Sequence, residues 1–136
     1  MTATCVAHDV DARDLERLPL FAGLTRTARE VVAEWLDVEQ VGAGYRLSRE
    51  GAAGYALVVL HQGSAVLTRA DLQQGRLGPG DWFGDIAPTS SGRSGATVVT
   101  DSAATVYLLG ASSLRQMDRD LPGVTAALRA RAALDV

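Results

Sequence analysis

The spacing of hydrophobic and polar residues changes twice along the chain, near residues 38 and 110. Between Ala28 and Leu36, five apolar residues recur at i, i+3, i+4, i+7 and i+8, which is one face of an amphipathic helix. Thr25 or Thr27 can cap that helix. A shorter helical stretch, Ala12–Leu18, precedes it and is halted by a proline. Residues 1–10 show no such spacing and are expected to form a mobile tail.

After Val38 the glycines recur every few residues and separate short β-prone runs. The runs expected to form strands are Glu39–Val41, Tyr45–Ser48, Tyr55–Leu60, Ala65–Thr68, Leu72–Leu77, Ala96–Thr100 and Ala103–Leu109. Helical preference returns at Ala111, with Ser112 or Ser113 as cap, and a last helix covers 121–134. Helices therefore flank a mainly β fold with the strands of a sandwich or barrel.

The composition narrows the class of protein. With 136 residues, 47% of them hydrophobic, residues 11–136 are expected to form one domain. All 13 basic residues are Arg, and the net charge of −3 disfavours direct DNA binding. The single cysteine, Cys5, fits a reducing compartment, and neither a signal sequence nor a membrane span is visible. We expect a cytoplasmic protein without a membrane partner.

Catalytic chemistry finds little support in the residue types present. Only His8 and His61 exist, so no imidazole cluster can bind a metal, and His61 is interpreted as a solvated residue at a strand end. Cys5 lies in the expected tail, and no serine stands in a nucleophile elbow. Without any lysine the chain cannot form a P-loop. The prediction is a protein that is not an enzyme, with no metal and no cofactor.

One segment, Gly78 to Val98, concentrates the unusual residues. A Gly-Pro-Gly-Asp turn is followed by the apolar pair Trp82 and Phe83, and then by Gly84, which allows close backbone approach. Asp85 begins a short helical turn whose free N–H groups can bind an anion. Arg93, eight residues later, can neutralise a phosphate. The plainer interpretation is that Asp85 caps the turn and Arg93 is a solvated loop charge.

These residues, in this order, resemble the cyclic nucleotide-binding domain family of the catabolite-activator and protein-kinase regulatory type. The resemblance runs from Leu15 to Leu134 and rests on four fragments. They are LPLFAGL at 18–24, VGAGYRL at 41–47, REG at 49–51 with Gly54 and Gly63 behind it, and LGPGDWFGD at 77–85 with its closing strand at 96–98. The resemblance implies a β-roll that holds a 3′,5′-cyclic nucleotide and C-terminal helices that move on binding.

Carried over residue by residue, the resemblance implies a ligand site without catalytic or metal-binding residues. The site residues are Phe83, Gly84, Asp85, Ile86, Ala87, Arg93, Ser94, Gly95, Ala96 and Thr97. Asp85 stands where the family has a ribose-binding Glu, so its carboxylate is about 1.5 Å shorter in reach. Ser94 stands where the phosphate-binding Arg is expected, and Arg93 comes one residue early. A slip in the flexible loop before Arg93 could bring it into place.

Two functions follow from these departures. In the first, the chain is a regulatory sensor for cAMP or cGMP, with cAMP favoured because Gly95 offers no hydroxyl to a guanine. In the second, the pocket is degenerate and the fold serves as a protein-interaction or assembly module. Binding of another small anion is a third possibility. The expected partners are the cyclic nucleotide and an effector protein or a second copy of the chain.

The last expected helix carries a narrow apolar stripe with arginines beside it. The stripe residues are Leu121, Val124, Ala127, Leu128 and Ala132. In the family this helix often contacts the base and forms a dimer interface, but the plainer interpretation is that the stripe covers the roll. The length leaves no room for a DNA-binding domain, so the output is expected from a separate partner or from a longer protein of which this is a fragment.

Overall fold

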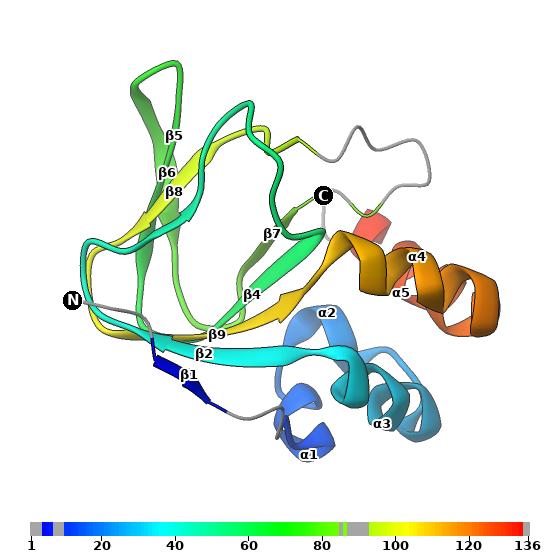
Figure 1. Cartoon of the computed structure of the whole chain (residues 1–136). Coiled ribbons are helices and arrows are strands. Elements are labelled where there is room, and N and C mark those ends of the chain that lie inside the picture. Colours follow the sequence, from blue (N-terminus) through cyan, green and yellow to red (C-terminus); the bar gives the residue numbers. More distant parts are fainter. Residues whose placement is uncertain (1–3, 7–9, 85, 87–92, 135–136) are drawn as a thin grey trace.

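The fold is a β-roll of two antiparallel sheets with helices at both ends of the chain (Figure 1). The computed structural model describes residues 4–6, 10–84, 86 and 93–134. The helices in this part of the chain are α1 (Ala12–Leu15), α2 (Pro19–Ala22), α3 (Arg26–Trp35), α4 (Ala111–Asp120) and α5 (Pro122–Leu134). The strands are β1 (Thr4–Val6), β2 (Asp37–Val41), β3 (Arg46–Ser48), β4 (Leu57–Gln62), β5 (Ala65–Arg69), β6 (Leu72–Leu77), β7 (Trp82–Gly84), β8 (Thr97–Thr100) and β9 (Ala104–Leu109). The prediction of a mainly β roll with flanking helices is confirmed.

Strand β4 shows why the roll needs helices. The described strands form one sheet in the order β1-β2-β9-β4-β7 and another in the order β3-β8-β5-β6. Alternate residues of a strand point to opposite faces. Val58 and Leu60 therefore join the cluster inside the roll, whereas Leu57 and Val59 join the cluster that packs against the helices. Both faces of the first sheet are apolar at β4, so the helices must cover its outer face.

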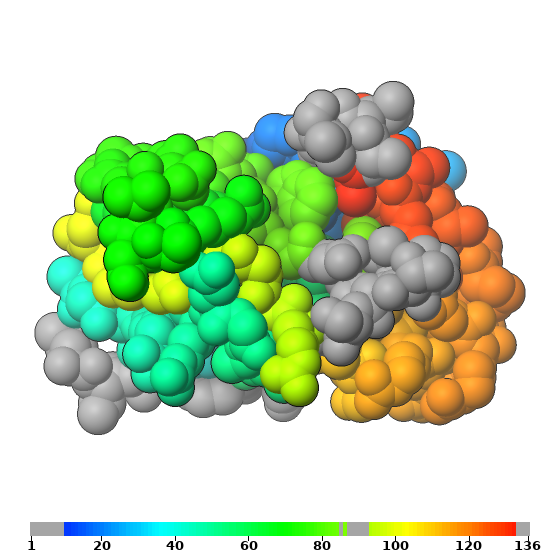
Figure 2. All heavy atoms as spheres, turned by 90° about the horizontal axis from the view of Figure 1, so that it is seen from above, coloured from blue at the N-terminus to red at the C-terminus, as the bar shows by residue number. Residues whose placement is uncertain are grey.

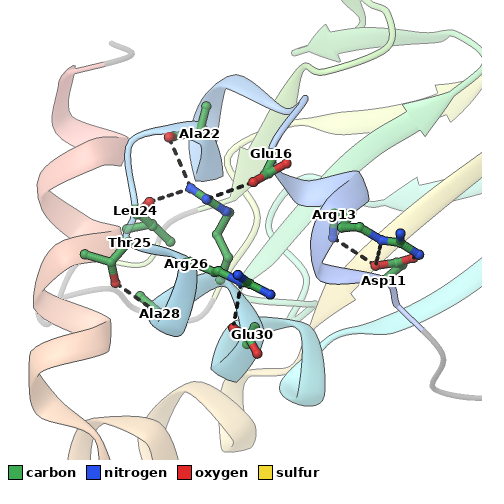
Figure 3. Close-up of polar contacts among 10 residues, drawn as sticks. Asp11, Arg13, Glu16, Ala22, Leu24, Thr25, Arg26, Ala28 and Glu30 are labelled. Carbon is green, nitrogen blue, oxygen red and sulfur yellow. Dashed lines mark hydrogen bonds and ion pairs between the residues drawn. The ribbon is translucent and has the colours of Figure 1, made fainter.

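The N-terminal helices are held by local caps. Pro19, expected to stop a helix, instead begins α2 at a position where its missing N–H costs nothing. Thr25 caps α3, its Oγ1 accepting a hydrogen bond from the Ala28 backbone N–H at 3.1 Å (Figure 3). Arg29 donates to the carbonyl oxygens of Ala22 and Leu24 and pairs with Glu16. These contacts tie the three helices to one another.

Four features differ from the sequence predictions. Strand β1 lies inside the segment expected to be a tail and pairs with β2, and β7 lies where only a turn with apolar anchors was expected. Gly110, not Ser112 or Ser113, is the N-cap of α4. His61 is not a solvated strand end, because it is half-buried and stacks on Tyr107 with 5.0 Å between ring centroids.

No helix in the described ranges is long and apolar enough to cross a membrane.

Candidate functional site

A cavity of about 420 Å³ lies between the roll and the C-terminal helices. Its strand wall is lined by Ser48, Gly54, Tyr55, Ala56, Leu67, Arg69, Phe83, Gly84, Arg93, Ser94, Gly95 and Ala96. Its helix wall is lined by Ala111, Leu114, Arg115, Asp118 and Arg129. Seen from above, the green and yellow strands lie on one side of the molecule and the orange and red helices α4 and α5 on the other (Figure 2).

One side of the cavity is formed by β7, whose position is set by the turn before it and by its pairing with β4. A tight turn precedes β7, in which the Gly78 N–H donates to Asp81 Oδ2 at 2.8 Å and Gly80 has a φ of +91°. Strand β7 then pairs with β4, which places Gly84 opposite Leu57. Gly84 has a φ of +133°, a conformation open to glycine and strained for other residues. The backbone can therefore pass close to β4 and leave space above it.

The segment around Arg93 is fixed by pairing with residues 51–54. The Ser94 N–H donates to the Ala52 carbonyl, and the Gly51 N–H donates to the Ser94 carbonyl, each at 2.8 Å. The Arg93 guanidinium donates to the carbonyl oxygen of Gly51 at 2.8 Å and is exposed. Ser94 is half-buried, and its Oγ lies next to Gly54. Arg93 thus lines the cavity while one of its nitrogens is bound to a backbone carbonyl.

Arg129 of α5 connects α4 to Ile86, two residues beyond the end of β7. Its Nη1 and Nη2 bind the two carboxylate oxygens of Asp118 in α4 at 2.6 and 2.8 Å, and its Nε donates to the Ile86 carbonyl at 2.5 Å. The hydrogen bonds from Arg129 are the largest cause of a lowered pKa of Asp118, and the same pair raises the pKa of Arg129. We call this set of contacts the Arg129 latch.

The cavity is positively charged although the chain has a net charge of −3. Among the described lining residues, four arginines (Arg69, Arg93, Arg115 and Arg129) face one carboxylate, Asp118. Guanidinium groups with planar donor forks suit phosphate oxygens. No cluster of three or more His, Cys, Asp or Glu occurs in the described part of the chain. The described arginines therefore make the cavity suited to the binding of an anion.

The structure brings together most of the residues that the sequence singled out. Those that line the cavity are Phe83, Gly84, Arg93, Ser94, Gly95 and Ala96. Ile86 is instead buried in the core, with 4% of its surface exposed, and contributes its carbonyl to the Arg129 latch. Thr97 lies outside the cavity lining, and its Oγ1 accepts a hydrogen bond from the Glu50 N–H. Asp85 and Ala87 lie outside the described residues.

Sequence reasoning missed the helix wall. Ala111, Leu114, Arg115 and Asp118 have the spacing i, i+3, i+4 and i+7, which puts them on one face of α4. That spacing was visible in the sequence, but a face with one arginine and one aspartate does not look apolar. Arg129 was noted only as a neighbour of the α5 stripe. Within that stripe Leu128 and Ala132 are buried, whereas Ala127 is exposed.

Comparison with known proteins decides the family. Residues 38–120 match the family model described as a cyclic nucleotide-binding domain. The chain belongs to the cyclic nucleotide-binding domain family. The matched range includes the whole strand wall of the cavity and all of α4.

The curated relatives that match this cyclic nucleotide-binding domain include regulatory subunits of cAMP-dependent protein kinases. The cAMP-dependent protein kinase regulatory subunit of Aspergillus fumigatus is 30% identical over an alignment of 109 residues that covers 76% of this chain and 25% of that protein. The chain thus spans about a quarter of the length of the curated relatives it matches.

Solved structures agree on the fold. The catabolite activator protein of Thermus thermophilus is 25% identical, with a TM-score of 0.70 over 86% of this chain and 57% of that one. A putative cyclic nucleotide-binding protein from Geobacter metallireducens is 17% identical and shares the fold, with a TM-score of 0.81 over 93% and 95% of the two chains.

Proposed function

We propose that this domain is a non-catalytic sensor that binds a 3′,5′-cyclic nucleotide, cAMP in preference to cGMP, in the cavity between the roll and α4. The observation that carries the proposal is the cationic cavity: among its described lining residues four arginines face one carboxylate, beside the close-approach glycine Gly84. A cyclic nucleotide has one phosphodiester charge and an apolar, stackable base. The cavity offers guanidiniums for the charge and Leu67, Phe83 and Leu114 for the base.

The binding signal would leave through the C-terminal helices. Arg129 holds the Ile86 carbonyl, α4 and α5 together at the edge of the cavity. Arg131, two residues further along α5, donates to the Pro19 carbonyl of α2 at 3.0 Å. A ligand that shifts the segment after Gly84 therefore acts on helices that also contact the N-terminal bundle. An effector protein or a second copy of the domain would read this change.

Isothermal titration of the purified domain with cAMP and with cGMP tests the proposal. Binding of cAMP with a lower Kd than cGMP is expected, because Gly95 has no hydroxyl for a guanine amino group. Absence of heat with either nucleotide at concentrations of about 1 mM would refute the sensor function, because it would mean a binding free energy weaker than roughly −4 kcal/mol.

The second candidate, a fold kept as a protein-interaction or assembly module, is favoured by one observation. The Arg93 guanidinium already donates a hydrogen bond to the Gly51 carbonyl. The position where the family resemblance expects the phosphate-binding arginine is held by Ser94, whose Oγ lies next to Gly54 in the cavity wall. An interaction module would bind neither nucleotide but would retain the stability of the folded domain. A cooperative melt without any shift on addition of cAMP or cGMP would support this second function.

A further inference from the structure

The face of α4 that lines the cavity carries an arginine, Arg115, in addition to those of the strand wall. Leu114 of this face is buried, with 7% of its surface exposed, and anchors the helix to the core. Arg115 is its neighbour in sequence, is exposed and lines the cavity from the helix side. The packing of Leu114 sets where the Arg115 backbone lies in this structure, and the long, flexible stem of Arg115 lets its guanidinium reach a ligand.

The four arginines of the cavity differ in what they already bind. Arg129 is engaged by Asp118 and by the Ile86 carbonyl. Arg69 donates to the Gly95 carbonyl at 3.1 Å, and Arg93 donates to the Gly51 carbonyl at 2.8 Å. Arg115 has no hydrogen bond or ion pair to any residue that the structure describes. An anion can bind Arg115 without the loss of an existing contact within this part of the chain.

We propose that Arg115 is a ligand-binding residue that supplies, from α4, a positive charge for the phosphate of the bound nucleotide. The inference rests on the proposed function and deepens it, because it makes the helix wall part of the binding surface. A guanidinium from α4 and the donors of the strand wall then contact the anion from opposite sides. Binding thereby draws α4 toward the roll, so occupancy and helix position become linked.

Arg115→Gln tests the inference, with Arg119→Gln as the matched control. Both residues are exposed on α4, but Arg119 is not among the cavity-lining residues. Loss of a charge-assisted hydrogen bond to phosphate weakens binding by roughly ten- to a hundredfold. Titration calorimetry should show such a rise in the Kd for cAMP with Arg115→Gln, and a change of less than about twofold with Arg119→Gln. A Kd for Arg115→Gln within twofold of wild type would overturn the inference and leave the sensor function intact.

Inorganic pyrophosphate separates failure of the inference from failure of the proposed function. If the wild type binds pyrophosphate but neither cyclic nucleotide, the sensor function fails. Abolition of that binding by Arg115→Gln would then show that Arg115 binds a phosphate group, though not that of a nucleotide. If the wild type binds none of the three, both proposals fail. An NMR titration of the unmodified domain with cAMP gives a readout independent of variant folding. The Arg115 Nε–H resonance should shift, and an unmoved resonance under saturating cAMP would contradict the inference.

Discussion

Gly84 is the residue whose backbone conformation the cavity depends on most directly. Its φ is +133°, and a Cβ added there would overlap the carbonyl oxygen of Ala56, the residue directly before β4. Gly84→Ala should therefore lower the free energy of unfolding by more than about 2 kcal/mol and distort the side of the cavity that β7 forms. Urea unfolding measures the loss.

Gly95→Ala is the control for Gly84→Ala, because Gly95 also lines the cavity but has nothing within 4 Å of an added Cβ. It should change the free energy of unfolding by less than about 0.5 kcal/mol. Equal stability of the two variants would mean that the close approach at Gly84 has no structural cost.

At the scale of residues, the sequence predicts backbone features but not the hydrogen-bond partners of long side chains. The turn at Gly78–Asp81 and the close approach at Gly84 follow from glycine's freedom at positive φ, which is a local property. The direction of the Arg93 guanidinium depends on the Gly51 carbonyl, a partner 42 residues away. No local pattern encodes such a contact. The same holds for Arg129, whose partners come from α4 and from the segment after β7.

At the scale of elements, the Arg129 latch joins α4 and α5, and its strength should depend on pH. Hydrogen bonds from Arg129 lower the pKa of Asp118 below its ordinary value of 3.8. A carboxyl with a lower pKa in the folded state stabilises the fold above the unfolded pKa, and this contribution is lost as the pH falls through the folded pKa. Asp118→Asn should therefore lower the free energy of unfolding at pH 7, and its difference from wild type should shrink toward about pH 2. Urea unfolding across that range measures the profile.

Asp120→Asn removes the same charge from the exposed end of α4, outside the latch, and serves as the control. Its profile should run parallel to that of the wild type. A difference between Asp118→Asn and wild type that stays constant from pH 7 to about pH 2 would contradict the ionic nature of the latch.

Most elements could be predicted from the sequence because their patterns are local. The runs Leu72–Leu77 and Ala103–Leu109 match β6 and β9 closely, since both are bounded by turn residues. Strands β1 and β7 are three residues long and owe their pairing to β2 and β4. Their sequences, TCV and WFG, show no alternation of apolar and polar residues, so only the partner strand reveals them. The helix wall of the cavity was missed for a related reason: it faces a ligand space, and its residues are polar where a core face would be apolar.

At the scale of the whole molecule, α5 contacts both the cavity lining and the N-terminal helices. Leu128 of α5 is fully buried in the cluster that also contains residues of α2 and α3, and Arg131 binds the Pro19 carbonyl. Helices α1 to α3 contribute no described residue to the cavity lining. The α5 contacts offer one route by which ligand binding would change the dynamics of these helices, and the lining residues Ala56 and Leu114, which share their core cluster, offer another.

Hydrogen exchange of the backbone amides, followed by mass spectrometry with and without saturating cAMP, tests this connection. Because a ligand held between the two walls draws α4 onto the roll, amides of α4 and α5 should exchange more slowly in the complex. Amides of α2 should follow, because Arg131 fixes the Pro19 carbonyl to α5. Strand β2, which pairs with β1 and β9 and lies outside the cavity lining, should not change. In Arg131→Gln the protection of α4 should persist while that of α2 is lost; unchanged protection of α2 would show that the signal does not travel through this contact.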